Sequence, residues 1–152
     1  MRIVGGRLRG RALAGPKSPA IRPTADRLRE SLFNILAHGY GDPVSGARVL
    51  DLFAGTGALG LGGTTRIFRR DATRLGAAHP LEPFGLAFAD PPYGQGLAQR
   101  ALEAARDGGW LTPDALAVVE EAVAAKFAAP EGFEEIERRD YDETEFIFLR
   151  RE

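Results

Sequence analysis

Two short apolar segments of this 152-residue chain each lead to an aspartate, and this repeated pattern limits the fold more than any other feature. Residues 47–53 (ARVLDLF) run into a glycine-rich turn, and residues 85–90 (GLAFAD) run into two prolines. Short apolar runs with such flanks are typical of strands buried in a parallel sheet. Helical patterns lie before and after them, so the sequence predicts an α/β protein with a mostly parallel sheet.

The remaining periodic segments add helices and a hairpin. A helix is predicted after Thr24, a residue type that caps helix N-termini well. Four residues at helical spacing form its apolar face: Leu28, Leu32, Ile35 and Leu36. Residues 95–106 have the pattern of a second amphipathic helix. Residues 133–140 and 144–151 alternate around an acidic turn, which predicts a C-terminal antiparallel hairpin.

Two other segments are ambiguous or unexpected. Residues 115–125 (ALAVVEEAVAA) have a helical periodicity, although the run LAVVEE after Pro113 also suits a buried strand. Residues 66–71 (RIFRRD) resemble a further strand, which would begin only five residues after Leu61. A parallel crossover needs a dozen or more residues, so the connection is too short.

Charge is distributed unevenly, and this indicates a polyanionic partner. Residues 1–30 carry eight basic and two acidic side chains, whereas the rest carries 12 basic and 19 acidic ones. A basic arm on an acidic body is typical of proteins that bind nucleic acid, although a solvated charged surface is an equal alternative. Residues 2–16 are predicted to form a β-hairpin or an extended arm, and we divide the chain into 1–45 (arm and first helix) and 46–152.

Several classes of protein are excluded by composition. Cysteine is absent, and His38 and His79 have no partner at ligand spacing, so no metal site is expected. No run of roughly 18 apolar residues is present, and the basic N-terminal stretch lacks the apolar core of a signal peptide. We therefore expect a cytoplasmic protein.

The glycine-rich turn predicts a nucleotide-type ligand. Residues 55–60 (GTGALG) fit the G-x-G-x-x-G pattern, in which glycines let the backbone approach a ligand at a helix N-terminus. Asp51 precedes this turn and would repel a pyrophosphate. A carboxylate there suits an amino group and sugar hydroxyls, which favours S-adenosylmethionine over NAD. A tight turn that binds nothing is the alternative.

The second aspartate opens the more specific motif, Asp90-Pro91-Pro92-Tyr93. The prolines donate no hydrogen bonds and keep the backbone extended, so their carbonyls are free to accept. The carboxylate of Asp90 and the carbonyl of Pro91 could take the two hydrogens of a planar exocyclic amine, with its ring stacked on Tyr93. The alternative is a proline-rich turn with a core tyrosine.

With these motifs in place, the sequence resembles a known family. DLFAGTGALGL followed by ADPPYG resembles the class I S-adenosylmethionine-dependent methyltransferases that modify exocyclic amines. RIVGGRLRGRALAGP and IRPTADRLRESLFNIL narrow the resemblance to the RsmD-type family, over nearly the whole chain. The resemblance implies a Rossmann-like fold with a small N-terminal hairpin and helix extension, and a strand at 115–120. It also implies methylation of a guanine N2 in 16S ribosomal RNA, free or in a small-subunit particle, by a monomer.

The resemblance also implies roles for particular residues. The cofactor-binding residues would be Asp51, Phe53, Ala54, Gly55, Thr56, Gly57, Ala58, Asp71, Ala72, Arg22 and Thr24. The catalytic residues would be Asp90, Pro91, Pro92 and Tyr93. The RNA-binding residues would be Arg2, Arg7, Arg9, Arg11, Lys17 and Arg27.

One departure from the family is large. The family has a second strand with a ribose-binding acid and flanking helices after the glycine loop, and none of this fits between Leu61 and Arg66. We expect that roughly 35–40 residues, a crossover unit plus a helix, are missing there, through deletion or through disorder. A DNA adenine-N6 methyltransferase and an inactive RNA-binding module are the competing interpretations.

Overall fold

The computed structural model describes residue 12 and residues 26–54 and 68–152. The chain divides into two compact units, residues 1–46 with 54–68 and residues 47–53 with 69–152. Apart from residue 12, the hairpin or extended arm predicted over residues 2–16 lies outside the described residues, and so does the predicted N-cap Thr24.

The predicted first helix is present in the first unit. Helix α1 (Asp26–Gly39) carries Leu32, Ile35 and Leu36 as buried residues and Leu28 as a partly buried one. The helix ends where its glycine was expected, and the amide of Asp42 donates to the carbonyl of Leu36 across 3.1 Å. The 3.6-residue periodicity was therefore a reliable guide here.

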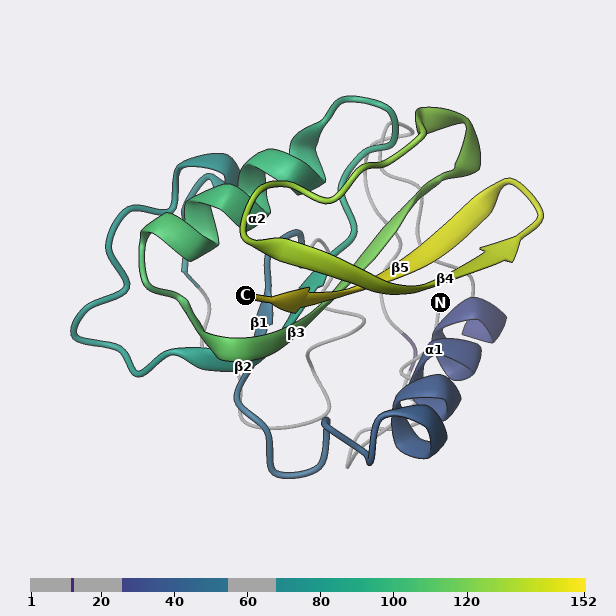
Figure 1. Ribbon diagram of the computed structural model, residues 1–152, viewed down its shortest axis with the longest axis horizontal. Coiled ribbons are helices and arrows are strands. Elements are labelled where there is room, and N and C mark those ends of the chain that lie inside the picture. The colour runs from purple at the N-terminus through teal and green to yellow at the C-terminus, as the bar shows by residue number, and fades with distance from the viewer. Residues whose placement is uncertain (1–11, 13–25, 55–67) are drawn as a thin grey trace. The chain divides into compact units, whose positions relative to one another are not determined.

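The second unit is built on one mixed sheet (Figure 1). Its described strands are β1 (Val49–Asp51), β2 (Phe84–Ala89), β3 (Leu111–Ala122), β4 (Phe133–Tyr141) and β5 (Thr144–Arg151). Their order is β1-β2-β3-β5-β4. The pairs β1–β2 and β2–β3 are parallel, whereas β3–β5 and β5–β4 are antiparallel. This confirms the Rossmann-like α/β prediction and the C-terminal hairpin.

One ambiguity is resolved and one local prediction is wrong. Residues 115–125 have a helical periodicity, but β3 covers Leu111–Ala122 and only the short 3₁₀ turn η2 (Val123–Ala125) follows it, which confirms the strand at 115–120 that the family resemblance implied. β3 lies between β2 and β5 and is buried on both faces from Ala115 to Glu121, so its apolar residues do not alternate with polar ones.

The strand predicted over residues 66–71 is not found in its described part. Residues 68–70 have no regular structure. The Arg70 guanidinium donates to the carbonyls of Leu75 at 2.9 Å and Ala77 at 3.4 Å, which draws the chain into a turn. A 3₁₀ turn, η1 (Ala72–Arg74), follows at once.

Helix α2 (Leu97–Asp107) packs on one face of the sheet, as Figure 1 shows. Its buried face is made of Ala98, Ala101, Leu102 and Ala105. These residues join Ala87, Val119 and Ile147 of the strands in one apolar cluster. Three of the four helix residues are alanines, which let the helix axis approach the strands closely. Together they confirm the second predicted helix.

The described residues offer neither a membrane span nor a metal cluster. No helix among them is long and apolar enough to cross a bilayer. No group of three or more histidine, cysteine, aspartate or glutamate side chains in the same residues could hold a metal ion.

Candidate active site

The two aspartates that end the apolar segments meet at one edge of the sheet. Asp51 is the last residue of β1 and is in register with Phe88 of the parallel neighbour β2. Asp90 follows the end of β2 directly, two residues beyond Phe88, so strand alternation places both on one face. The ladder continues past β1, since the Leu52 amide donates to the Phe88 carbonyl across 2.9 Å. Open α/β sheets bind ligands at this carboxyl edge.

Asp51 is a buried carboxylate without a hydrogen-bond partner. Both of its oxygens are inaccessible to solvent, and neither has a partner among the described residues. Burial raises the pKa of Asp51 to about 6; the Phe53 amide is near enough to oppose the rise slightly but does not form a hydrogen bond of good geometry. An isolated buried carboxylate is costly unless a cation or donors accompany it. The cationic amino group of S-adenosylmethionine fits this orphaned group.

The rest of the predicted methionine-binding loop is only partly described. Phe53 is half-buried and Ala54 is exposed. The other predicted cofactor residues from the loop and the first unit lie outside the described residues: Gly55, Thr56, Gly57, Ala58, Arg22 and Thr24.

Asp71 and Ala72, the predicted adenine contacts, have local structural roles. The exposed Asp71 carboxylate accepts from the amide and hydroxyl of Thr73, at 2.9 and 2.7 Å, and so caps η1. These two bonds lower the pKa of Asp71. Ala72 is buried in the cluster beneath α2. The segment is thus fixed against the sheet unit, with its carboxylate already engaged.

The 90–93 motif forms a loop at the end of β2. Pro91 is buried, Pro92 is exposed, and Asp90 and Tyr93 are half-buried. The Tyr93 hydroxyl donates to a carboxylate oxygen of Glu120 and lies 3.5 Å from the hydroxyl of Thr144. The pKa of Tyr93 is raised above its ordinary value, mainly by burial and also by the negative charge of Glu120.

The amide of the following residue, Gly94, is also fixed. It donates to a carboxylate oxygen of Glu121 across 3.0 Å. Sequence reasoning missed both Glu120 and Glu121. The available signal was the unusual pair of adjacent glutamates inside the apolar run LAVVEE, because charged residues are seldom fully buried unless they are paired.

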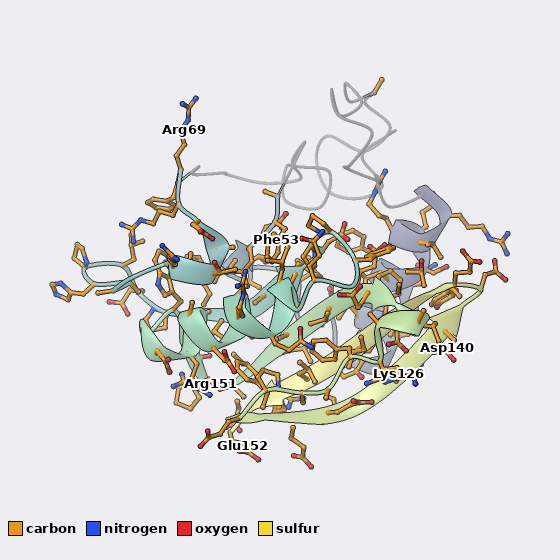
Figure 2. The ribbon with its side chains drawn as sticks, turned by 90° about the horizontal axis from the view of Figure 1, so that it is seen from above. Phe53, Arg69, Lys126, Asp140, Arg151 and Glu152 are labelled. Atoms are coloured by element: carbon orange, nitrogen blue, oxygen red, sulfur yellow. The ribbon has the colours of Figure 1, made fainter. Side chains whose placement is uncertain are left out.

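The predicted RNA-binding residues fall mostly outside the described residues: Arg2, Arg7, Arg9, Arg11 and Lys17. Arg27 is exposed on α1. The sheet unit adds exposed arginines that sequence reasoning did not single out, and Figure 2 shows the Arg69 side chain extending away from the ribbon. Arg74 and Arg100 lie close enough to Asp71 for their charges to lower its pKa further.

Strands β1, β2 and β3 are parallel, and Asp51 and Asp90 lie where β1 and β2 end. Strands β5 and β4 extend this sheet in the antiparallel sense. This arrangement agrees with the Rossmann-like fold of class I methyltransferases. Comparison with known proteins narrows this class. The family described as Conserved hypothetical protein 95 matches residues 1–72 and 61–150. The chain belongs to this family, the RsmD-type methyltransferases.

Named relatives and solved structures agree. The "Ribosomal RNA small subunit methyltransferase D" of Escherichia coli K12 is 36% identical over 154 positions, which take in 81% of this chain and 75% of that protein. A putative methyltransferase from Escherichia coli superposes with a TM-score of 0.78 at 30% identity, over 100% of this chain and 98% of its own. A hypothetical protein from Thermus thermophilus gives a TM-score of 0.64 at 30% identity, over 97% and 98% of the two chains.

These comparisons also bear on the missing segment. Because 81% of 152 residues is about 123, about 31 of the 154 aligned positions hold no residue of this chain. The family matches overlap at residues 61–72, which locates the interruption there. The sequence itself therefore lacks a piece of the family fold, somewhat shorter than we expected.

Proposed function

We propose that the chain transfers a methyl group from S-adenosylmethionine to the N2 amine of a guanine in small-subunit ribosomal RNA, in the cytoplasm and as a monomer. The observation that carries this proposal is the geometry of the carboxyl edge. The buried, unpartnered Asp51 ends β1, and the neighbouring β2 runs directly into Asp90 and two prolines. The name of the Escherichia coli relative supports the RNA substrate.

Each residue of the edge has a separate task in this proposal. Asp51 would hold the amino group of the cofactor, which, unlike the sulfonium, offers a buried carboxylate both a positive charge and hydrogen-bond donors. S-adenosylmethionine, when bound, supplies an electrophilic methyl group on its sulfonium.

The target amine would be oriented by the 90–93 loop. The Asp90 carboxylate and the Pro91 carbonyl accept its two N–H groups, which favours a pyramidal nitrogen with its lone pair directed at the methyl group. Asp90 also stabilises the positive charge that develops on the nitrogen. The guanine must leave its helix or loop to reach this edge, and the ring of Tyr93 would then stack against it.

Basic residues would bind the RNA backbone. The predicted arm residues and the exposed arginines of the sheet unit would contact phosphates, which makes binding salt-dependent. The interrupted crossover supports a second candidate function, an RNA-binding module that no longer binds the cofactor, since about 31 positions of the relative have no counterpart here. Calorimetry with S-adenosylmethionine separates the two, because the inactive module should give no heat of binding.

The test of catalysis is transfer of a tritiated methyl group to 16S rRNA, small-subunit particles and duplex DNA. The variant Asp90→Asn should lose about 100-fold or more of kcat, with cofactor affinity retained. Asp142→Asn is the matched control, because Asp142 is exposed in the β4–β5 turn at a φ of 57°, where asparagine is tolerated. Near-normal turnover by Asp90→Asn, or transfer to DNA alone, would refute the proposal.

A further inference from the structure

The loop at the end of β2 has few backbone donors with which to fix itself. Pro91 and Pro92 carry no N–H group, so neither can donate to a hydrogen-bond ladder. The next two residues carry the side-chain and main-chain donors that the loop uses, namely the hydroxyl of Tyr93 and the amide of Gly94. The groups that accept these two protons therefore help to fix the position of the loop.

Both acceptors are adjacent residues of β3. Glu120 accepts from the Tyr93 hydroxyl, and Glu121 accepts from the Gly94 amide across 3.0 Å. Successive residues of a strand point to opposite faces of the sheet. Glu121 continues the face of Val119, which packs in the cluster beneath α2, whereas Glu120 lies on the other face. The loop is thus held from both faces of the strand next to its own.

Burial makes these two contacts significant. Glu120 is 5% exposed and Glu121 is 2% exposed. Burying a carboxylate costs free energy unless it is hydrogen-bonded. One oxygen of Glu121 accepts from the Gly94 amide and from the Ala122 amide at 2.9 Å, so it joins the loop directly to β3. Two adjacent buried carboxylates would destabilise the end of β3 if they served only to fill space.

We propose that Glu120 and Glu121 are positioning residues for the methyl-transfer reaction: they fix the 90–94 loop before the target base arrives. Glu120 sets the Tyr93 ring through its hydroxyl, and Glu121 sets the turn into α2 through Gly94. This inference rests on the proposed function for the role of the loop. Displacing a catalytic group by about 1 Å can lower turnover about 100-fold. A loop that is already in position should therefore affect kcat rather than affinity.

The kinetic test compares Glu120→Met with Glu120→Gln. Methionine has a similar length, but its thioether sulfur is only a weak acceptor for the phenol proton, whereas the glutamine carbonyl is a good one. We expect Glu120→Met to lose about 10-fold or more of kcat with cofactor affinity and RNA KM within about twofold, and Glu120→Gln to recover most of it. Tyr93→Phe combined with Glu120→Met should be no slower than the slower single variant, because each change removes the same hydrogen bond between Tyr93 and Glu120.

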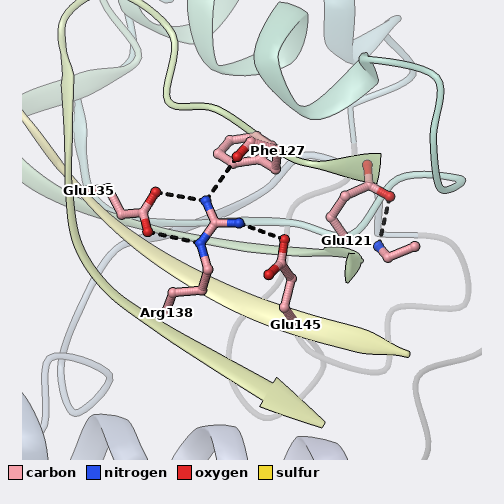
Figure 3. Close-up of polar contacts among 6 residues, drawn as sticks. Glu121, Phe127, Glu135, Arg138 and Glu145 are labelled. Carbon is pink, nitrogen blue, oxygen red and sulfur yellow. Dashed lines mark hydrogen bonds and ion pairs between the residues drawn. The ribbon is translucent and has the colours of Figure 1, made fainter. Parts of the chain in front are cut away.

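The control for losing a buried carboxylate is Glu145→Gln. Glu145 is 2% exposed on β5 and lies opposite Glu121 in the β3–β5 register. Its carboxylate oxygen pairs with Arg138 of β4 at 2.8 Å and not with the loop (Figure 3). This variant should keep wild-type kcat. If Glu145→Gln lowers kcat as much as Glu120→Met, or if Glu120→Met turns over normally, the role of Glu120 is only structural and the inference fails.

A second readout does not depend on catalysis. Hydrogen exchange of the Gly94 amide, followed by NMR, should be about 10-fold or more faster in Glu121→Met than in wild type or Glu145→Gln. Unchanged exchange would overturn the inference. Should the wild type transfer no methyl group at all, the proposed function fails, and the exchange rates still decide whether the glutamates hold the loop.

Discussion

Replacing Asp51 with asparagine should stabilise the ligand-free protein at neutral pH. The pKa of Asp51 rises from 3.8 to about 6 because the carboxylate is buried without a partner. The folded state therefore resists ionisation more than the unfolded state does. At about 1.4 kcal/mol for each pKa unit, the ionised carboxylate costs the fold about 3 kcal/mol at pH 7.5.

The sign of the effect fixes its pH dependence. A raised carboxyl pKa contributes stability that is fully present below pH 3.8 and is lost as the pH rises through about 6. Asp51→Asn cannot ionise, so its advantage over wild type should grow from about 1 kcal/mol at pH 4.5 to about 3 kcal/mol at pH 7.5.

Urea unfolding in buffers from pH 4.5 to 7.5 measures this difference. Trp110 is the single tryptophan and is 1% exposed, so its fluorescence reports unfolding of the sheet unit. Asp71→Asn is the opposite control, because the pKa of Asp71 is lowered and its loss should destabilise the protein at neutral pH. The reasoning fails if Asp51→Asn is no more stable than wild type at pH 7.5, or if the difference is independent of pH.

Three further outcomes follow from the same structure. Affinity for S-adenosylmethionine, measured by calorimetry, should fall as the pH drops below about 6, because Asp51 gains a proton, and Asp51→Asn should lose this dependence. Arg138→Met should lower the free energy of unfolding by about 3 kcal/mol, since it leaves the buried Glu145 unpaired, whereas Arg139→Met should cost under about 1 kcal/mol. Gly108→Ala should lower the melting temperature, because the new Cβ would lie 2.1 Å from the Gly76 carbonyl oxygen.

Sequence patterns were informative wherever one face of an element is polar. The helix at residues 26–39 and the strand at 133–141 follow from spacing and alternation. The strand at 144–151 is buried on both faces from Thr144 to Leu149, and the acidic turn before it helped to predict it. β3 is buried on both faces, and a continuous apolar run does not distinguish a helix from a strand. The strand predicted at residues 66–71 failed over residues 68–70 for another reason. Arg70 donates to nearby carbonyls, and the strand pattern gives no sign of these contacts.

The two aspartates of the candidate site could be predicted from the sequence, but the glutamates that hold the neighbouring loop could not. Asp51 and Asp90 could be placed together because each follows a strand-like run and parallel strands share their carboxyl edge. The contacts of Glu120 and Glu121 join residues 27 positions apart, and no local pattern encodes such pairs. The glutamates were visible in the sequence only as charges in an apolar run.

The position of β5 has a consequence for synthesis. This strand, residues 144–151, lies between β3 and β4, and Phe146, Ile147, Phe148 and Leu149 are at most 1% exposed. While the ribosome is still translating the preceding residues, the free edge of β3 has no neighbour and stays open to other chains. Among the described strands, the edge of β3 is covered only when β5 has emerged from the exit tunnel, so a translational pause before residue 144 should favour aggregation or chaperone binding over folding.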